Sequence, residues 1–578
     1  MRKKKSSLIA AVLIAGLLAG CGNSGTPGNA EVSDSAAGSG SAEASQAEAQ
    51  TESGGGSGNF NEFGWEVPEE TLEINILDAS GSYAPTEAEK VGEENVIAYF
   101  KEKFNIQFNI QHITGDGTEA VNLALASGDY PDIIRNLSFT TMEKFVKMNK
   151  AVELTPYMDN IGADVKASMG EHYPLFLDDE MKLWYVPTLM GSISELPDNS
   201  AHIRYDEWQA IGSPEIKTPD DYYNALNAIL EKFPTTPNGE SRYAMSLYED
   251  PDPATYSGFW GLKNGYKVDD EGNFTYWAFT DEGKEMTKFF NRFYQDKTLD
   301  PDAFANNFEQ WKAKFSSERI VGAIGGWWIS YNAGHEVWQS MDPNMPEDKR
   351  FVQISFKGEG AEGAYLSGKN YLGSSCTIIT DKAKDPESLM KFINFQATDL
   401  GKAISGWGIP NGTPIGDTGR TGKFWNIDEN GNWEVDPEAK QQLVTETWSY
   451  DDEYYWQGVP WLFMNQSRWD DGEHNIWPNQ MWYEENKWKS MMIENMEGTI
   501  FDASTYTLRV KSDEVKLAEQ SVKDAWKMNW PIAVQANNDE EFEAAWTKLQ
   551  DALTVAGIDK IEEAYSENYK EAMEKMGQ

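Results

Sequence analysis

Cysteine is almost absent from this chain of 578 residues, which contains only Cys21 and Cys376. Because Cys21 stands at the end of an N-terminal export segment, no second cysteine remains to form a disulfide with Cys376, and an intrachain disulfide framework is excluded. Histidine is scarce too, with five in the chain. One segment begins like a zinc-protease helix at His335, but Gln339 stands where the second histidine ligand is needed. We therefore expect no zinc site, and the hydrophobic core must stabilise the fold.

Basic residues are outnumbered: Lys and Arg total 49 against 94 Asp and Glu, which gives a formal net charge of −45. Such a surface repels nucleic acid and anionic lipid headgroups, so we expect neither as a partner. Long apolar runs are missing as well, because Leu8–Leu18 is only about half the length that spans a bilayer. With so many acids, some carboxylate pair always lies at a glycosidase-like separation, so such pairs do not identify an enzyme.

The first 21 residues have the features of an export signal. Arg2 and Lys3–Lys5 precede the apolar run, and Leu18-Ala-Gly-Cys21 ends it. Leu18–Cys21 resembles the lipobox of bacterial lipoproteins, in which the Cys sulfur takes a diacylglyceryl group and becomes the new N-terminus. We therefore predict a signal peptide over residues 1–20 and a palmitate-type lipid anchor at Cys21, since two acyl chains anchor stably. Ordinary cleavage near residue 20 with a free thiol is the alternative.

The next segment, residues 21–60, consists almost entirely of Gly, Ser, Ala, Glu, Gln, Thr and Asn. It lacks the apolar residues that would offset the entropy lost on ordering, so we predict a disordered tether.

From Phe63 onward, strand and helix patterns alternate. Apolar and polar residues alternate over Leu72–Asp78 and Ile106–Ile113, and a buried strand is expected at Asp132–Arg135. Helices are expected between these strands, near Glu93–Phe104 and Thr118–Ser127. Thr218, Asp385 and Asn538 have the sequence context of helix N-caps. Strands separated by helices predict an α/β fold with a parallel sheet.

Two motifs imitate ligand sites. Gly358-x-Gly-x-x-Gly363 matches a dinucleotide fingerprint, but the residues after it do not form a helix pattern, so a Gly-rich loop is favoured. The segment from Asn426 has spaced Asn and Asp residues like an EF-hand loop, but Pro437 stands at position twelve. We favour a hairpin between Phe424–Ile427 and Asn432–Val435. No cofactor is expected, and calcium at this loop is the alternative.

Aromatic residues are abundant, with 22 Trp, 25 Tyr and 26 Phe. Several tryptophans lie beside glycines, namely Trp260, Trp327 after Gly325-Gly326, and Trp407. We expect Ile320–Ile324 to form a strand that the two glycines end, so that Trp327 points into a binding cleft. Flat aromatic faces suit the C–H faces of sugar rings, while core packing is the alternative for each tryptophan.

The order of short motifs along the chain resembles that of family 1 extracellular solute-binding proteins of ABC importers, especially the long lipoproteins of Gram-positive bacteria. The motifs are Leu18–Cys21, Ala126–Ile134, Leu183–Pro187, Ile203–Trp208, Thr218–Tyr222, Phe279–Gly283, Leu299–Pro301, Ile324–Trp327, Asp385–Thr398, Trp407–Ile409 and Glu540–Tyr569.

The resemblance implies a type II periplasmic-binding-protein-like fold. Two discontinuous α/β lobes are joined by crossing segments near Leu183–Pro187 and Tyr365–Gly373, and a hinge closes them around a ligand in the interlobe cleft. We assign residues 61–185 and 370–440 to the first lobe. Residues 186–369 and 441–578 form the second.

The resemblance also implies which residues contact the ligand. They are Asp78, Arg135, Asn136, Trp184, Tyr185, Arg204 and Trp327; Trp260 and Trp407 are added from their local context. Asp132 and Asp206 belong to the same motifs but are expected to hold structure.

The expected function is capture of a carbohydrate, such as an oligosaccharide, and its delivery to ABC permease subunits by a monomer anchored on the extracellular side of the cell membrane. Two alternatives remain: a lipoprotein that presents ligand to a membrane sensor, and an exported carbohydrate-active enzyme. No catalytic residue is assigned.

Overall fold

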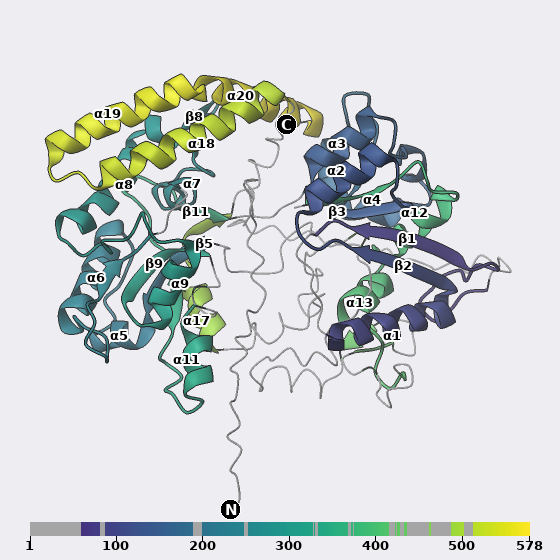
Figure 1. Ribbon diagram of the computed structural model, residues 1–578, viewed down its shortest axis with the longest axis horizontal. Helices are drawn as coiled ribbons and strands as arrows, with labels where there is room; N and C mark the ends of the chain where they lie inside the picture. The colour runs from purple at the N-terminus through teal and green to yellow at the C-terminus, as the bar shows by residue number, and fades with distance from the viewer. Residues whose placement is uncertain are drawn as a thin grey trace, which may run out of the picture.

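A computed structural model describes residues 59–80, 87–188, 199–247, 253–326, 329, 333–367, 372–373, 375–414, 422, 425–427, 433–435, 462–463, 487–501 and 512–577. The predicted signal peptide, Cys21 and nearly all of the predicted tether lie outside these ranges. Two α/β lobes lie side by side in Figure 1, each built around its own sheet. Within the described ranges, no helix has both the length and the hydropathy that a membrane span requires.

The first lobe contains a five-stranded sheet in the order β2-β1-β3-β12-β4. Its strands are β1 (Leu72–Asp78), β2 (Ile106–His112), β3 (Ile133–Leu137), β4 (Val186–Thr188) and β12 (Ser375–Ile379). β1 pairs in parallel with β2 and β3, whereas β12 runs antiparallel to both β3 and β4. The helices of this lobe are α1 (Glu87–Phe104), α2 (Gly117–Ser127), α3 (Phe139–Lys147), η1 (Thr155–Tyr157), α4 (Ala163–Met169), η2 (Gly170–Phe176), α12 (Pro386–Phe395) and α13 (Asp399–Trp407).

The sequence patterns account for these elements. Ile74 and Ile76, alternate residues of β1, are 0% and 1% exposed, so one face of the strand is buried. Asp116 caps α2 by accepting the backbone N–H groups of Thr118 and Glu119, and Gly128 ends the helix with a left-handed φ of 75°. The predicted strands and helices between Leu72 and Arg135 are therefore confirmed, although α1 begins at Glu87 and not at Glu93.

The second lobe contains a four-stranded sheet in the order β10-β5-β9-β6. The strands of this sheet and the shorter strands near it are β5 (Asn199–Arg204), β6 (Tyr243–Met245), β7 (Tyr266–Val268), β8 (Phe274–Tyr276), β9 (Ile320–Gly326), β10 (Phe351–Ile354), β11 (Ala364–Ser367) and β15 (Thr499–Phe501). The helices are α5 (Tyr205–Ala210), α6 (Pro219–Lys232), α7 (Pro253–Ser257), η3 (Gly258–Trp260), η4 (Trp277–Phe279), α8 (Asp281–Gln295), α9 (Phe308–Ser316), α11 (His335–Met341) and α17 (Lys487–Asn495). Thr218 caps α6 in a capping box with Asp221, as its sequence context predicts.

Three C-terminal helices complete the second lobe: α18 (Asp513–Val534), α19 (Asp539–Ala556) and α20 (Ile558–Met576). They form the yellow layer at the top of Figure 1. Trp530, Leu549 and Ile561 place this layer on the second hydrophobic core. The layer also reaches the first lobe, because Lys516 Nζ of α18 lies 3.8 Å from Glu143 Oε2 of α3.

The chain passes between the two sheets near the predicted crossing segments. The first crossing runs from β4 of the first-lobe sheet to β5 of the second-lobe sheet. The chain returns to the first-lobe sheet between β11 and β12. One boundary differs from the sequence-based assignment of residues 441–578 to the second lobe. Leu462 and Phe463 lie in the first hydrophobic core, where Gln396 Oε1 accepts both of their backbone N–H groups, and the second core is rejoined at Trp488.

Three local predictions can be compared with the structure. The predicted hairpin is confirmed as β13 (Trp425–Ile427) paired antiparallel with β14 (Trp433–Val435). The Gly358–Gly363 loop leads into β11 and not into a helix, and a Cβ at Gly358 would lie 2.7 Å from the Trp260 ring, so close packing explains that glycine. The strand predicted at Ile320–Ile324 is confirmed as β9, which extends through the two glycines, paired with Ser200 and Asn199, and ends at Gly326.

Candidate functional site

Polar side chains gather where the parallel strands of the first lobe end. Asp78 ends β1, His112 ends β2, and both are directly opposed across the sheet. Arg135 is the partner of Asp78 on β3, and Asn136 follows it with a left-handed φ of 55°, which Asn tolerates better than most residues. In open α/β sheets ligands bind beyond these carboxyl ends. The structure thus brings together three of the residues that the sequence assigned to the ligand.

Asp78 is the centre of this cluster and is only 2% exposed. Its Oδ2 accepts from Arg135 Nη2 at 2.9 Å, and its Oδ1 accepts from Asn136 Nδ2 at 2.8 Å. His112 Nδ1 lies 3.3 Å from Asp78 Oδ2, while His112 Nε2 lies 2.9 Å from Glu93 Oε1. Both carboxylate oxygens of Asp78 are therefore hydrogen-bonded to neighbouring side chains, and the carboxylate positions Arg135 and Asn136.

The cluster balances its charges. Burial raises the pKa of the Asp78 carboxyl, but hydrogen bonds from His112, Arg135 and Asn136 and the Arg135 charge outweigh burial and hold that pKa well below its usual range. Burial lowers the pKa of His112, but its contacts with Asp78 and Glu93 raise it to about 9. His112 is therefore a cation at neutral pH, held between two carboxylates.

We expect this cation to make stability depend on pH. Because the folded pKa of His112, about 9, exceeds its ordinary value of 6.5, its contribution is complete below pH 6.5 and is lost as the pH rises through about 9. Urea unfolding of the wild type at about pH 6 and about pH 10 should show this loss, and His112→Gln should reduce it. His172→Gln is the control, since burial lowers the pKa of His172 and places its effect at acidic pH. An equal high-pH loss in wild type and His112→Gln would contradict this account.

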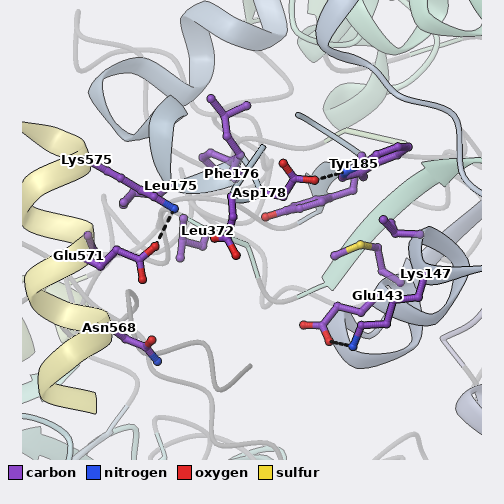
Figure 2. A pocket seen from close by; sticks show the side chains of 16 residues that line it. Glu143, Lys147, Leu175, Phe176, Asp178, Tyr185, Leu372, Asn568, Glu571 and Lys575 are labelled. Carbon is purple, nitrogen blue, oxygen red and sulfur yellow. Dashed lines mark hydrogen bonds and ion pairs between the residues drawn. The ribbon is translucent and has the colours of Figure 1, made fainter. Parts of the chain in front are cut away.

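A pocket of about 380 Å³ lies between the two lobes. Figure 2 shows its side chains, with α20 on one side and first-lobe residues on the other. The first lobe contributes Met142, Glu143, Val146, Lys147, Leu175, Phe176, Leu177, Asp178, Asp179, Trp184, Tyr185 and Leu372, and α20 contributes Asn568, Glu571, Ala572 and Lys575. The volume is in the range of small-molecule sites, and apolar walls with a few polar groups are typical of them.

Local contacts fix the aromatic residues of this pocket. Trp184 Nε1 donates to Asp178 Oδ2 at 2.6 Å, and the other Asp178 oxygen accepts the backbone N–H groups of Glu180 and Lys182. Tyr185 is 4% exposed, and its ring packs edge-on against Phe139 with centroids 5.6 Å apart. Both rings line the pocket, but Trp184 is half-buried whereas Tyr185 is buried.

Two other predicted ligand residues are buried inside the second lobe, where they contact other side chains of that lobe. Arg204 is 2% exposed; it donates to both carboxylate oxygens of Asp206 at 2.7 and 2.9 Å and to Glu318 at 3.1 Å. Trp260 is 6% exposed and packs against Phe289 and Phe356 in the core. These placements favour structural roles, which Asp206 shares as expected. Asp132 likewise accepts from Asn75 at 2.6 Å.

Trp327 and Cys21 lie outside the described residues, and Trp407 is described only as the last residue of α13. Sequence reasoning missed the α20 residues Asn568, Glu571 and Lys575, because nothing in an amphipathic C-terminal helix indicates that its outer face meets the other lobe. In the described part of the chain, no group of three or more His, Cys, Asp or Glu residues could hold a metal ion. Of the candidate EF-hand-like loop that begins at Asn426, residues 428–432 lie outside that part.

Comparison with known proteins identifies the family of this chain. The family of bacterial extracellular solute-binding proteins matches residues 81–403, more than half of the chain. The chain belongs to this family. Solute binding, and not catalysis, is therefore its established class of function, and an extracellular or periplasmic location goes with it. No curated protein matches the sequence.

Solved structures share the fold of this solute-binding protein at low sequence identity. The alginate-binding protein AlgQ2 without calcium ion is 16% identical, has a TM-score of 0.58, and covers 88% of this chain and 99% of its own. FusA of Streptococcus pneumoniae, an ABC-transporter substrate-binding protein in complex with kestose, is 16% identical, with a TM-score of 0.60 and coverages of 86% and 99%. An HMO-binding solute-binding protein from Bifidobacterium longum infantis is 13% identical, with a TM-score of 0.58 and coverages of 87% and 99%. They establish the two-lobed binding-protein fold.

Proposed function

We propose that this protein binds a carbohydrate between its lobes and delivers it to the permease of an ABC transporter, while a lipid at Cys21 holds it on the extracellular side of the cell membrane. The observation that carries the proposal is the pocket of about 380 Å³, to which both lobes contribute. A ligand there contacts α3 and Trp184 of one lobe and α20 of the other, so its binding energy favours one arrangement of the lobes.

The chemistry of the pocket supports a sugar. The Trp184 ring is held by its bond to Asp178 and can cover the apolar face of a pyranose. The Asn568 amide can donate a hydrogen bond to a sugar hydroxyl group or accept one from it, and the carboxylates of the wall can accept hydrogen bonds from hydroxyl groups. The three similar structures named above are described as alginate-binding, kestose-bound and HMO-binding, which agrees with this ligand class.

The residues at the carboxyl edge of the first sheet are a second part of the proposed binding surface. Arg135 and Asn136 are held there by Asp78, at the position where α/β sheets bind ligands. We propose that they contact the ligand while Asp78 positions them. Trp327, directly after the carboxyl end of β9, is proposed as the facing residue of the second lobe.

A saccharide should raise the melting temperature of the purified protein, because a ligand that binds only the folded state stabilises it. A panel of mono- and oligosaccharides would be tested by thermal shift, and ligand recovered after long incubation with the protein would be analysed by chromatography. We expect a shift of several degrees with at least one oligosaccharide, which is recovered intact. A product formed in proportion to protein concentration would contradict a pure binding role, and no shift with any saccharide would contradict the ligand class.

Replacement of Cys21 by alanine should abolish lipid attachment, because the Cys sulfur is the acylated atom. Metabolic labelling with a radioactive fatty acid would show label on the wild type and none on Cys21→Ala. Cys376→Ala is the matched control: Cys376 is 0% exposed, so its variant should keep the label. Label that persists on Cys21→Ala would overturn the anchoring proposal.

A further inference from the structure

Helix α20 is part of the second lobe at its start and lies against the first lobe at its end. Ile558 and Ile561, in its first turns, are buried in the second hydrophobic core. Further along, α20 packs on η2 of the first lobe and lines the interlobe pocket. Figure 2 shows this part of α20 facing the side chains of the first lobe. The last turns of α20 are therefore a wall that the second lobe contributes to the pocket.

Ala572 stands at the centre of this wall. The other three α20 residues that line the pocket, Asn568, Glu571 and Lys575, have longer polar side chains, and Asn568 and Lys575 lie one helical turn before and after Ala572. Ala572 is 6% exposed, yet among the described residues it belongs to none of the hydrophobic core clusters. Its methyl group is therefore buried at the pocket between the lobes and not in the core of either one.

Bulky apolar side chains line the pocket on the first-lobe side. η2 ends with Leu175 and Phe176, Leu177 follows, and all three line the pocket. Phe176 is 3% exposed and belongs to the first hydrophobic core, so it cannot move away without leaving a destabilising cavity. A side chain larger than a methyl group at position 572 would therefore take its space from the ligand.

We propose that Ala572 sets the size of the saccharide that the interlobe pocket accepts. The proposal rests on the proposed function, because it assumes that the saccharide binds in this pocket. A methyl group at this position lets a sugar ring approach α20 closely, where the Asn568 amide of the preceding turn can bond to its hydroxyl groups. A larger side chain would occupy the space of a ring, so a long saccharide would lose more affinity than a short one.

Replacement of Ala572 by larger apolar residues tests the proposal. Ala572→Val and Ala572→Met would be titrated calorimetrically with the longest and the shortest saccharide that raise the melting temperature of the wild type. We expect affinity for the long saccharide to fall with side-chain size, by at least about tenfold in Ala572→Met, and affinity for the short one to fall less than about threefold. Both free variants should melt close to the wild type, and if Ala572→Met does not fold, the smaller step to valine decides.

Ala544→Met is the matched control, because Ala544 is an exposed residue of α19 that is not among the lining residues of the pocket. It should keep the wild-type affinity for both saccharides. Unchanged affinity for the long saccharide in Ala572→Met overturns the inference. An equal loss for both saccharides also overturns it, because it would show that the larger side chain pushes the lobes apart. If no saccharide binds the wild type, the proposed function itself fails.

Discussion

Asp78→Ala is expected to lower the free energy of unfolding by about 3–5 kcal/mol, because removal of one partner from a buried ion pair leaves the other charges uncompensated. Asp78 is 2% exposed, and Arg135 and His112 both depend on its carboxylate. Without it, Arg135 loses its carboxylate partner, His112 keeps only Glu93, and Asn136 loses its acceptor. Urea denaturation followed by circular dichroism would measure the change.

Asp159→Ala is the matched control for this prediction. Asp159 also accepts from a basic side chain, Lys166, at 2.6 Å, but its own side chain is 86% exposed. An exposed pair contributes at most about 1 kcal/mol, so this variant should unfold nearly like the wild type. A similar small loss in both variants would show that the Asp78 cluster is solvated and does not support the sheet edge. Calorimetric titration of Asp78→Ala with a saccharide would then report any direct role in binding.

Trp184→Ala should weaken saccharide binding ten- to a hundredfold. A lost ring-stacking face costs roughly 1–3 kcal/mol, on the scale of one buried large apolar side chain, and about 1.4 kcal/mol corresponds to a factor of ten. The bond from Trp184 Nε1 to Asp178 holds the ring before the ligand arrives, so little ordering entropy is lost on binding. Calorimetric titration with the saccharide that gives the largest thermal shift would measure the affinity.

Trp208→Ala supplies the comparison for Trp184→Ala. Trp208 is also half-buried with a bonded ring nitrogen, which donates to the Pro214 carbonyl at 3.1 Å, but it lies on α5 of the second lobe and does not line the pocket. It should lose a similar amount of stability and no affinity. Equal affinities of the two variants would remove Trp184 from the binding surface.

Local patterns predicted much of the fold. Alternation over Leu72–Asp78 and the caps at Thr218 and Asn538 are determined by neighbouring residues, so they can be read from the sequence. The position of Leu462 and Phe463 depends on Gln396, which is distant in the sequence, and no local pattern indicates it.

The candidate site was predicted less completely. The clustering of Asp78, Arg135 and Asn136 follows from the rule that parallel strands end at one edge, together with the family resemblance. Arg204 and Trp260 carry the same residue types but are buried among partners that come from elsewhere in the lobe, such as Glu318 and Phe356. Residue type and position in a motif do not distinguish a side chain that faces a ligand from one that faces the core.

The position of β12 in the first sheet has a consequence for how the chain folds. β12 lies between β3 and β4, yet it begins at Ser375, after all four strands of the second-lobe sheet. Until that segment is available, β3 and β4 have unpaired edges that can pair with other chains. Contacts so distant in sequence form slowly, because loop-closure entropy is lost before they are gained. The sheet of the first lobe therefore cannot be completed until the second-lobe strands have been synthesised and β12 follows them. A chain that ends before Ser375 would leave the edges of β3 and β4 open to aggregation.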